Sequence, residues 1–403
     1  MRFSSRGQSA ADVSREHADR QTNACSAAVP HGFVDLSRAD NLLMKRLLVE
    51  KLSCNDEQWI PNASLLSVHP ANSGWFSEQA RGVIAPWIQR WTNADIEVHP
   101  DNFAASVTAD PFDVYLVPTP TYVNFTSNLF DRAQVAIEPV QMQLNATANS
   151  AALNLTDVQR VCDQLKAKGK RVRGICLINP HNPTGICFSK QEMLSVLQFA
   201  AKAGLSVFVN EDFVTSVYNG QFESVLSYWS QTPAPNHIVW ICGFSKALSL
   251  PGLRLGVTFC TNKSLNGAMA RMDMLQSTFI TQTVAVRLLS DFDWFENAFL
   301  PTNQSKLAEA WSFVRQMLLE YSIPFIEPMG GFFVFIDLRQ YLTEQTFEGE
   351  AELADRFRHV GVALNAGGTL LHAQPGWFRL VFTQETPTLV EGLRRIKLVL
   401  GRL

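Results

Sequence analysis

Several features that would assign a function at once are absent from this sequence. It has no long apolar run, no cluster of basic residues, no CxxC spacing and no GxGxxG or Walker-type motif. A membrane span, a nucleic-acid surface, a cysteine-based zinc site and a Rossmann or P-loop nucleotide site are therefore not expected. The net charge of −3, with both signs interspersed, also argues against nucleic acid and membrane partners.

Paired cysteines and a targeting segment are also lacking. The seven cysteines are scattered, and several interrupt apolar runs as small buried hydrophobic residues do. This pattern predicts reduced thiols in a cytoplasmic protein and no metal site. Residues 1–30 are polar and contain acids, without the apolar core of a secretory signal. We expect them to form a disordered N-terminal arm.

The chain has enough hydrophobic residues for a large core, and its predicted strands and helices alternate regularly. Its 403 residues are 46% hydrophobic, which predicts about two domains. Helical periodicity covers 154–170, and a capping box at 189–192 opens a helix that stops at Gly204. Apolar strands are predicted at 116–120, 172–179, 205–209 and 237–243. This alternation predicts an α/β fold with a mainly parallel sheet between helices.

Polar residues follow three of these strands, at the edge where such sheets bind ligands. Asn182 lies in "NPHNPTG", where two X-Pro turns force an extended loop. Asn210 ends the strand in "VFVNEDF", and Lys246 follows the strand in "GFSK". Each alone has an ordinary structural explanation, but their occurrence on successive strand ends indicates a binding site.

The chemistry of these residues suits a phosphorylated aromatic aldehyde. A lysine that is partly desolvated near other cations loses proton affinity and forms Schiff bases. Ser245 and Arg254 offer a hydroxyl and a forked cation for a phosphate. Asn182 has a donor for a ring oxygen, and Tyr122 has a flat face for stacking.

Several motifs are similar to those of a known enzyme family. "NPHNPTG", "SKALSLPGLRLG" and "PGWFRLVF" resemble the motif series of pyridoxal-phosphate enzymes of aminotransferase class I, fold type I. "VDLSRADN", "DFDWFENAFLPTNQSKL" and "GGFFVFIDLRQYL" make the 1-aminocyclopropane-1-carboxylate synthase-like branch the nearest in character. The resemblance runs from about Val34 to the C-terminus.

Carried over by position, the resemblance implies a set of site residues. Lys246 would bind the pyridoxal 5'-phosphate covalently and then act as the base that moves the substrate's α-proton. The other implied cofactor-binding residues are Tyr122, Asn182, Asn210, Ser245 and Arg254. The implied substrate-binding residues are Asp40, Asn41 and Arg379, of which Arg379 would take the α-carboxylate as a bidentate pair.

The chain also departs from the family at the pyridine ring. Asn210 stands where the family has an Asp that pairs with the ring nitrogen, and Phe213 stands where it has a Tyr. Asparagine does not hold the nitrogen protonated by charge, which makes the cofactor a weaker electron sink. Asp212 is a candidate substitute for the missing acid, although a solvated or loop-capping role is the simpler expectation.

The phosphate end departs as well. The family's glycine-rich loop and helix, between the segments matching 99–107 and 108–122, are missing from the sequence. Gly243 replaces a hydroxyl residue, and Asn72 replaces a tyrosine that reaches the partner subunit. All three departures are expected to weaken cofactor binding.

Two functions follow as alternatives. The first is a pyridoxal-phosphate enzyme of amino acid metabolism, either an aminotransferase or a lyase with 1-aminocyclopropane-1-carboxylate synthase-like or C–S lyase chemistry, in a biosynthetic process. The second is a catalytically impaired homologue that keeps the fold for binding, or a truncated gene model that lacks the phosphate loop. The resemblance implies a homodimer with a large cofactor-binding domain (54–290) and a smaller α+β domain (31–53 and 291–403).

Overall fold

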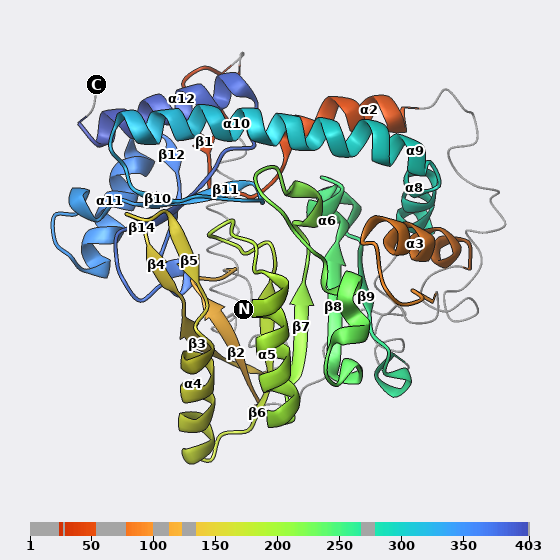
Figure 1. Ribbon diagram of the computed structural model, residues 1–403. Coiled ribbons are helices and arrows are strands. Elements are labelled where there is room, and N and C mark those ends of the chain that lie inside the picture. The colour runs from red at the N-terminus through yellow and green to blue at the C-terminus, as the bar shows by residue number, and fades with distance from the viewer. Residues whose placement is uncertain are drawn as a thin grey trace, which may run out of the picture.

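The largest sheet of the protein is mainly parallel. The computed structural model describes residues 24–26, 29–53, 78–99, 113–122, 134–266 and 279–401. Within them, six strands form this sheet (Figure 1), in the spatial order β3 (Ala136–Gln141), β2 (Val114–Thr119), β6 (Val172–Ile178), β7 (Ser206–Asn210), β8 (Ile238–Gly243) and β9 (Gly256–Phe259). Neighbours are parallel except β9, which is antiparallel to β8. The predicted α/β fold is confirmed.

The helices between these strands form where local signals predict them. α5 (Lys190–Ala203) connects β6 to β7, and α4 (Leu155–Ala167) lies between β3 and β6 in the chain, after a short hairpin at 143–152. The capping box at the start of α5 is complete, because Ser189 and Glu192 bond each other's backbone N–H groups. Gly204 ends α5 with φ 69°, a conformation that glycine adopts without strain.

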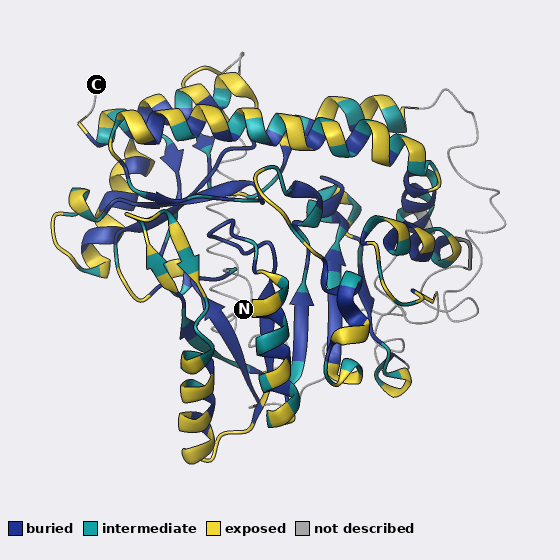
Figure 2. Ribbon diagram, in the orientation of Figure 1, coloured by how far each residue is buried: buried dark blue, intermediate teal, exposed yellow. Residues whose placement is uncertain are grey.

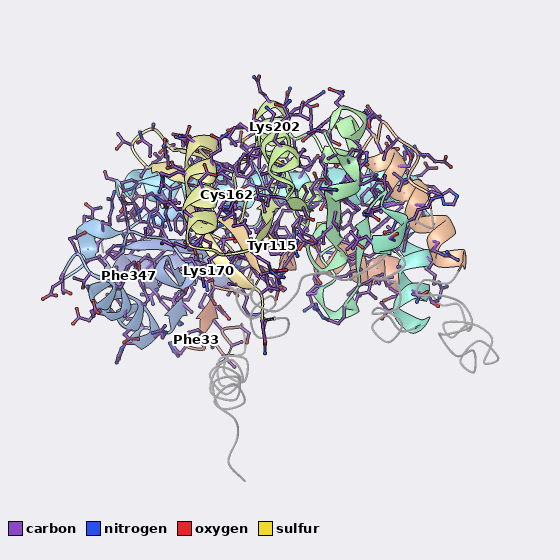
Figure 3. All side chains as sticks on the ribbon, turned by 90° about the horizontal axis from the view of Figure 1, so that it is seen from below. Phe33, Tyr115, Cys162, Lys170, Lys202 and Phe347 are labelled. Atoms are coloured by element: carbon purple, nitrogen blue, oxygen red, sulfur yellow. The ribbon has the colours of Figure 1, made fainter. Side chains whose placement is uncertain are left out.

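The two faces of the large sheet have separate apolar contacts. Seen from below in Figure 3, α4 with Cys162 and α5 with Lys202 lie side by side on one face of the sheet. Cys162 belongs to the main core on that face. Tyr115 on β2 belongs to a smaller cluster on the other face, with Cys176 and Phe208. The strands are thus apolar on both faces, as the continuous hydrophobic runs predict.

A second sheet is built from the C-terminal third. Its order is β10 (Phe325–Ile326), β11 (Phe333–Asp337), β14 (Trp377–Val381) and β13 (Asn365–Ala366), all antiparallel. The early strand β1 (Val34–Asp35) pairs with β12 (Val362–Ala363). The helices of this region are α10 (Leu300–Glu320), α11 (Phe347–His359) and α12 (Thr386–Val399). Pairing of β1 with β12 brings the segment that contains Asp40 to the C-terminal region.

Further elements complete the described chain. They are α2 (Lys45–Leu52), α3 (Glu78–Trp91), β4 (Gln143–Asn145), β5 (Ser150–Ala152), α6 (Phe244–Ala247), α8 (Phe279–Leu289), α9 (Phe292–Trp294) and a π-helix at Phe295–Phe299, besides short 3-10 turns. The long helix α10 runs along the top of the molecule in Figure 1, from the side of α12 to α9. Within the described ranges, no helix is both long and apolar enough to cross a membrane.

The apolar core divides mainly by sheet. One cluster fills the large sheet and its helices, and a second joins Val34 and Leu36 to residues 307–400. Figure 2 shows most strands of the two main sheets buried, whereas β4, β5 and the outer faces of the helices are more exposed. Met44 and Leu48 pack in the first cluster although they precede residue 54, so the predicted domain boundaries stay a prediction.

The predicted N-terminal arm falls largely outside the described residues. Within it, Ala24 forms a bridge with Phe33, and Cys25 N donates to the Phe33 carbonyl. The six cysteines in the described ranges are free thiols.

Candidate active site

The polar residues at the strand ends meet at one cavity. It has a volume of about 410 Å³ and lies beyond the carboxyl ends of β6, β7 and β8. Strands β13 and β14 of the second sheet and the segment after β1 line its other side. Six of the residues predicted for the site line it: Asp40, Tyr122, Asn182, Asn210, Lys246 and Arg379. The structure therefore brings together residues that are up to 339 positions apart, Asp40 and Arg379.

Lys246 reaches the cavity from the short helix α6, directly after β8. Its Nζ donates to the carbonyl of Ala39 at 2.5 Å and lies 3.2 Å from Asp40 Oδ1. Burial lowers the pKa of Lys246, and the ion pair with Asp40 opposes this effect. Asp40 in turn accepts a bond from Arg38 at 2.8 Å. Asp40 thus holds the amine of Lys246 in place and also pairs with Arg38.

Arg379 is a buried cation, and its hydrogen-bond partners among the described residues include no carboxylate. It lies on β14 and is 4% exposed. Its Nη1 donates to Asn182 Oδ1 at 2.8 Å, and its Nη2 donates to Asn365 Oδ1 at 2.8 Å and to the Ser37 carbonyl at 2.7 Å. Burial lowers the pKa of Arg379 to about 10. Because the described partners of this buried guanidinium are neutral, Arg379 is suited to bind an anion that enters the cavity.

The loop that carries Asn182 is fixed by its own hydrogen bonds. Asn179 Oδ1 accepts from Phe188 N at 2.9 Å, and His181 Nδ1 lies 2.8 Å from Thr184 Oγ1. Gly185 has φ 74°, and a Cβ there would come within 2.5 Å of the Pro328 side chain. The sequence pattern of this loop is therefore explained by backbone geometry as well as by the site.

Asn210 and Asp212 form a small network at the end of β7. Asn210 Oδ1 accepts from Asp212 N at 2.9 Å, and Asn210 Nδ2 lies 3.3 Å from Asp212 Oδ2. Asp212 Oδ1 accepts from Gly243 N at 2.5 Å, which ties the ends of β7 and β8 together. Burial raises the pKa of Asp212, against the opposing effect of these bonds and of Lys246. Asp212 thus caps a loop, as predicted, and it also lines the cavity.

Phe213 joins the cavity wall to the second core. Its ring makes edge contacts with Phe332 and Phe333, at 5.3 and 5.2 Å between centroids. It is 4% exposed. Where the family has a hydroxyl, this chain has a packing contact with the C-terminal sheet.

Glu211 is fully buried and faces away from the cavity. Its carboxylate accepts from Ser224 Oγ at 2.5 Å, Val225 N at 2.7 Å and Trp240 Nε1 at 2.8 Å. Burial nevertheless raises its pKa to about 7, against the opposing effect of these hydrogen bonds. Glu211 therefore holds the 224–231 segment against β8 and takes no part in the cavity.

This burial predicts a pH dependence of stability. The folded pKa of Glu211 lies above its unfolded value of 4.5, so the folded chain retains a proton that the unfolded chain releases. Its contribution is present below pH 4.5 and is lost as the pH rises through about 7. We expect Glu211→Gln to gain up to about 3 kcal/mol relative to the native chain between pH 5 and pH 8.

Paired unfolding experiments across this pH range measure the effect. Titration of His181 and His372, whose pKa values burial lowers, is common to both chains and cancels in the difference. A difference in unfolding free energy that does not change with pH would contradict the expectation.

The pair predicted to bind phosphate lies outside the lining of the cavity. Arg254 Nη1 donates to Ser245 Oγ at 3.2 Å and to the Pro251 carbonyl at 3.0 Å. Arg254 is exposed, with φ 53°. The two residues do come together, next to Lys246 in the chain. The junction at 100–112, where the sequence lacks the family's glycine-rich loop, falls outside the described residues, and so does Asn72.

Asn41 has partners that are structural. Its Oδ1 accepts from Leu43 N at 3.2 Å, which caps a short 3-10 turn, and its Nδ2 donates to Asn303 Oδ1 at 2.7 Å. It is buried and does not line the cavity. Asn41 is therefore not among the predicted site residues that line the cavity.

Three polar residues of the cavity lining were not predicted from the sequence: Ser37, Arg38 and Asn365. Ser37 and Arg38 lie inside the quoted "VDLSRADN", so the motif itself was the signal. Asn365 is paired with Arg379 across β13 and β14, and no local pattern indicates that pairing.

Comparison with known proteins identifies the family. The family description "Aminotransferase class I and II" matches residues 101–396. Because this covers more than half of the chain, the protein belongs to the class I and II aminotransferase family.

Two mouse proteins are similar to the chain. "Probable inactive 1-aminocyclopropane-1-carboxylate synthase-like protein 2" is 32% identical over 376 residues, which are 88% of this chain and 63% of that protein. "1-Aminocyclopropane-1-carboxylate synthase-like protein 1" is 30% identical over 391 residues, which are 92% and 76% of the two chains. The chain thus spans slightly less than two thirds of the length of the first relative.

A solved structure has the same fold. Aspartate aminotransferase from Thermus thermophilus, with maleate, superposes with a TM-score of 0.74 and 19% identity. The superposition covers 99% of this chain and 100% of that one. It supports fold type I, with the large parallel sheet and the smaller C-terminal sheet in the same chain.

Proposed function

We propose that the protein is a pyridoxal-phosphate-dependent enzyme that acts on an amino acid, as an aminotransferase or a lyase. Membership in the aminotransferase family indicates pyridoxal phosphate as the cofactor. The observation that carries the proposal is the meeting of two cations in one cavity. Lys246 has an amine of lowered pKa, and Arg379 is a buried guanidinium whose partners in the described part of the chain are neutral acceptors. The amine of Lys246 would react with the aldehyde of the cofactor, and the guanidinium of Arg379 would bind the carboxylate of the substrate.

The residues present fit the ring of the cofactor and the amino acid. A cavity of about 410 Å³ is in the range of small-molecule sites. Nε of Arg379 is buried without a hydrogen-bond partner among the described residues, so it retains a donor for a bound anion. Lys246, Tyr122, Asn182 and Asn210 would hold the ring, and Ser245 with Arg254 would hold the phosphate.

The chain's own groups define the chemistry. Pyridoxal phosphate, when bound, supplies an aldehyde that reacts with amines and a ring that withdraws electrons from the substrate's Cα. Arg379 orients the substrate by its carboxylate. Lys246 Nζ takes and returns the proton at Cα, and burial lowers its pKa toward the range useful for a base. Asp40, 3.2 Å from Nζ, stabilises the protonated amine.

A second candidate function is supported by the network around Asn210. Its amide is bonded to Asp212, and Phe213 has no hydroxyl. Both changes weaken activation of the ring, and one similar mouse protein is named "probable inactive". The alternative is therefore a homologue of impaired catalysis that retains amino acid or cofactor binding.

An assay with single amino acids separates the two functions. The purified protein is incubated with pyridoxal phosphate and each amino acid, and oxo acids, ammonia and elimination products are measured by mass spectrometry. We expect one group of substrates to give product, with the rate lost in Lys246→Ala. Covalent loading of the cofactor without product from any amino acid would favour the impaired homologue.

The further parts of the proposal rest on the family. We infer a large domain at 54–290 and a small domain from 31–53 and 291–403, with the cavity between them. A homodimer in the cytoplasm and a biosynthetic role in amino acid metabolism are part of the same proposal. Light scattering at several concentrations tests the dimer.

A further inference from the structure

Asp212 occupies an unusual position at the mouth of the large sheet. It is the second residue after β7, and its side chain turns toward the neighbouring strand. Its Oδ1 accepts the N–H of Gly243 at 2.5 Å, and its Oδ2 lies 3.3 Å from Asn210 Nδ2. It also lines the cavity, where the charge of Lys246 acts to lower the pKa of Asp212. A carboxylate thus stands between the end of β8 and the space for a ligand.

The carboxyl group of Asp212 packs closely against Gly243. The φ of Gly243 is −98°, which any residue adopts, so the backbone does not require glycine. A Cβ at this position would lie 3.0 Å from Asp212 Oδ1 and 3.3 Å from its Cγ. These contacts are closer than ordinary van der Waals distances, so a side chain at 243 needs Asp212 to move. The close approach of Asp212 therefore explains why position 243 has a glycine, which carries no Cβ.

The same contact disfavours a phosphate at this end of the cavity. The N–H of Gly243 already donates to an oxygen of the Asp212 carboxyl group. Arg254, the predicted phosphate cation, is exposed and bonds Ser245 and a carbonyl of its own loop. Solvent screens an exposed cation more than it screens the half-buried carboxylate. A phosphate dianion beside Gly243 would therefore be repelled by the ionised form of Asp212.

We propose that Asp212 sets the affinity of the site for its cofactor by excluding the phosphate group from Gly243. The chain then holds pyridoxal phosphate weakly, with little preference over pyridoxal, which has the same ring and aldehyde without the phosphate. This inference rests on the proposed function, because it concerns the same cavity. It assigns to Asp212 a role in cofactor specificity that the family's own pattern does not contain.

Equilibrium binding of the two aldehydes tests the role of Asp212. Dissociation constants for pyridoxal phosphate and pyridoxal are measured by absorbance titration on the native chain and on Asp212→Asn. Asparagine keeps the size of the side chain and removes its charge. We expect the variant to bind pyridoxal phosphate at least about tenfold more tightly and to change its affinity for pyridoxal by less than about threefold. Glu211→Gln, which removes the neighbouring carboxylate outside the cavity, is expected to change neither.

A double substitution tests the fit between the two positions. Gly243→Ser adds a hydroxyl for the phosphate but collides with Asp212, so alone it should not tighten binding. Combined with Asp212→Ala, it should tighten the binding of pyridoxal phosphate by more than the two single changes predict together.

The outcomes separate this inference from the proposed function. Equal changes for both aldehydes, or no change in Asp212→Asn, would overturn the role of Asp212 while the native chain still binds the aldehydes. Weaker binding of both would also overturn it, because Asp212 would then support the ring. No binding to any of the chains would overturn both the inference and the proposed function.

Discussion

Replacing Lys246 with alanine is expected to abolish the covalent adduct with pyridoxal phosphate. Lys246 Nζ is the amine that lines the described part of the cavity. Burial lowers its pKa and so raises the fraction of the neutral amine that attacks an aldehyde. After incubation with pyridoxal phosphate and reduction with borohydride, intact mass and peptide mapping should locate the cofactor on Lys246 in the native chain. The variant should show no adduct, and any amino acid turnover should fall by at least about 10³-fold.

The fold is expected to survive this substitution. Asp40 loses one cationic partner but keeps Arg38, whose Nη2 lies 2.8 Å from Asp40 Oδ2. Circular dichroism and the melting temperature check this point.

Lys306→Ala is the matched control for reactivity. The amine of Lys306 is also partly buried and also donates to a backbone carbonyl, that of Leu43 at 2.8 Å. It has no place in the cavity lining, so its loss should leave the adduct unchanged. An adduct of equal yield in Lys246→Ala would show that another amine reacts, and the assigned active site would be wrong.

The fold was largely predictable because its signals are local. The capping box at Ser189 and Glu192 fixes the start of α5, and Gly204 fixes its end. The apolar runs of the parallel strands were recognised for the same reason, since each run is buried on both faces. Strand ends were then the natural place for ligands, and Asn182, Asn210 and Lys246 do line one cavity.

What the sequence did not predict depends on contacts between distant segments. Asn365 bonds Arg379 because β13 pairs with β14, and the register of that pairing has no local signal. Asp212 was expected to cap a loop or face solvent. Its contact with Gly243 requires the end of β7 to lie beside the end of β8, which only the sheet provides. The glycine at 243 was noticed as a missing hydroxyl, whereas the structure explains it by the carboxylate packed against it.

Substitution of Arg379 is expected to have the second large effect, on substrate binding. Removing one partner of a buried charge-assisted pair costs about 2 to 5 kcal/mol, which corresponds to about 30-fold to 3,000-fold in affinity. We therefore expect Arg379→Met to raise the KM for an amino acid by about that factor. The yield of the cofactor adduct should change far less, because Lys246 makes no hydrogen bond to Arg379. Steady-state kinetics, or the binding of an unreactive carboxylic acid analogue, measures the change.

Conservative and distant variants show whether the guanidinium itself is responsible. Arg379→Lys keeps the charge but loses the fork that spans Asn182 and Asn365, so most of the defect should remain. Arg339→Lys changes a nearby arginine on the adjoining loop, which pairs with Asp337 outside the cavity. It should leave the KM within about threefold of the native value, since it alters only a partly exposed ion pair. Equal defects in Arg379→Met and Arg339→Lys would mean that the second sheet is generally disturbed. A KM unchanged in Arg379→Met would show that the substrate carboxylate does not bind at Arg379.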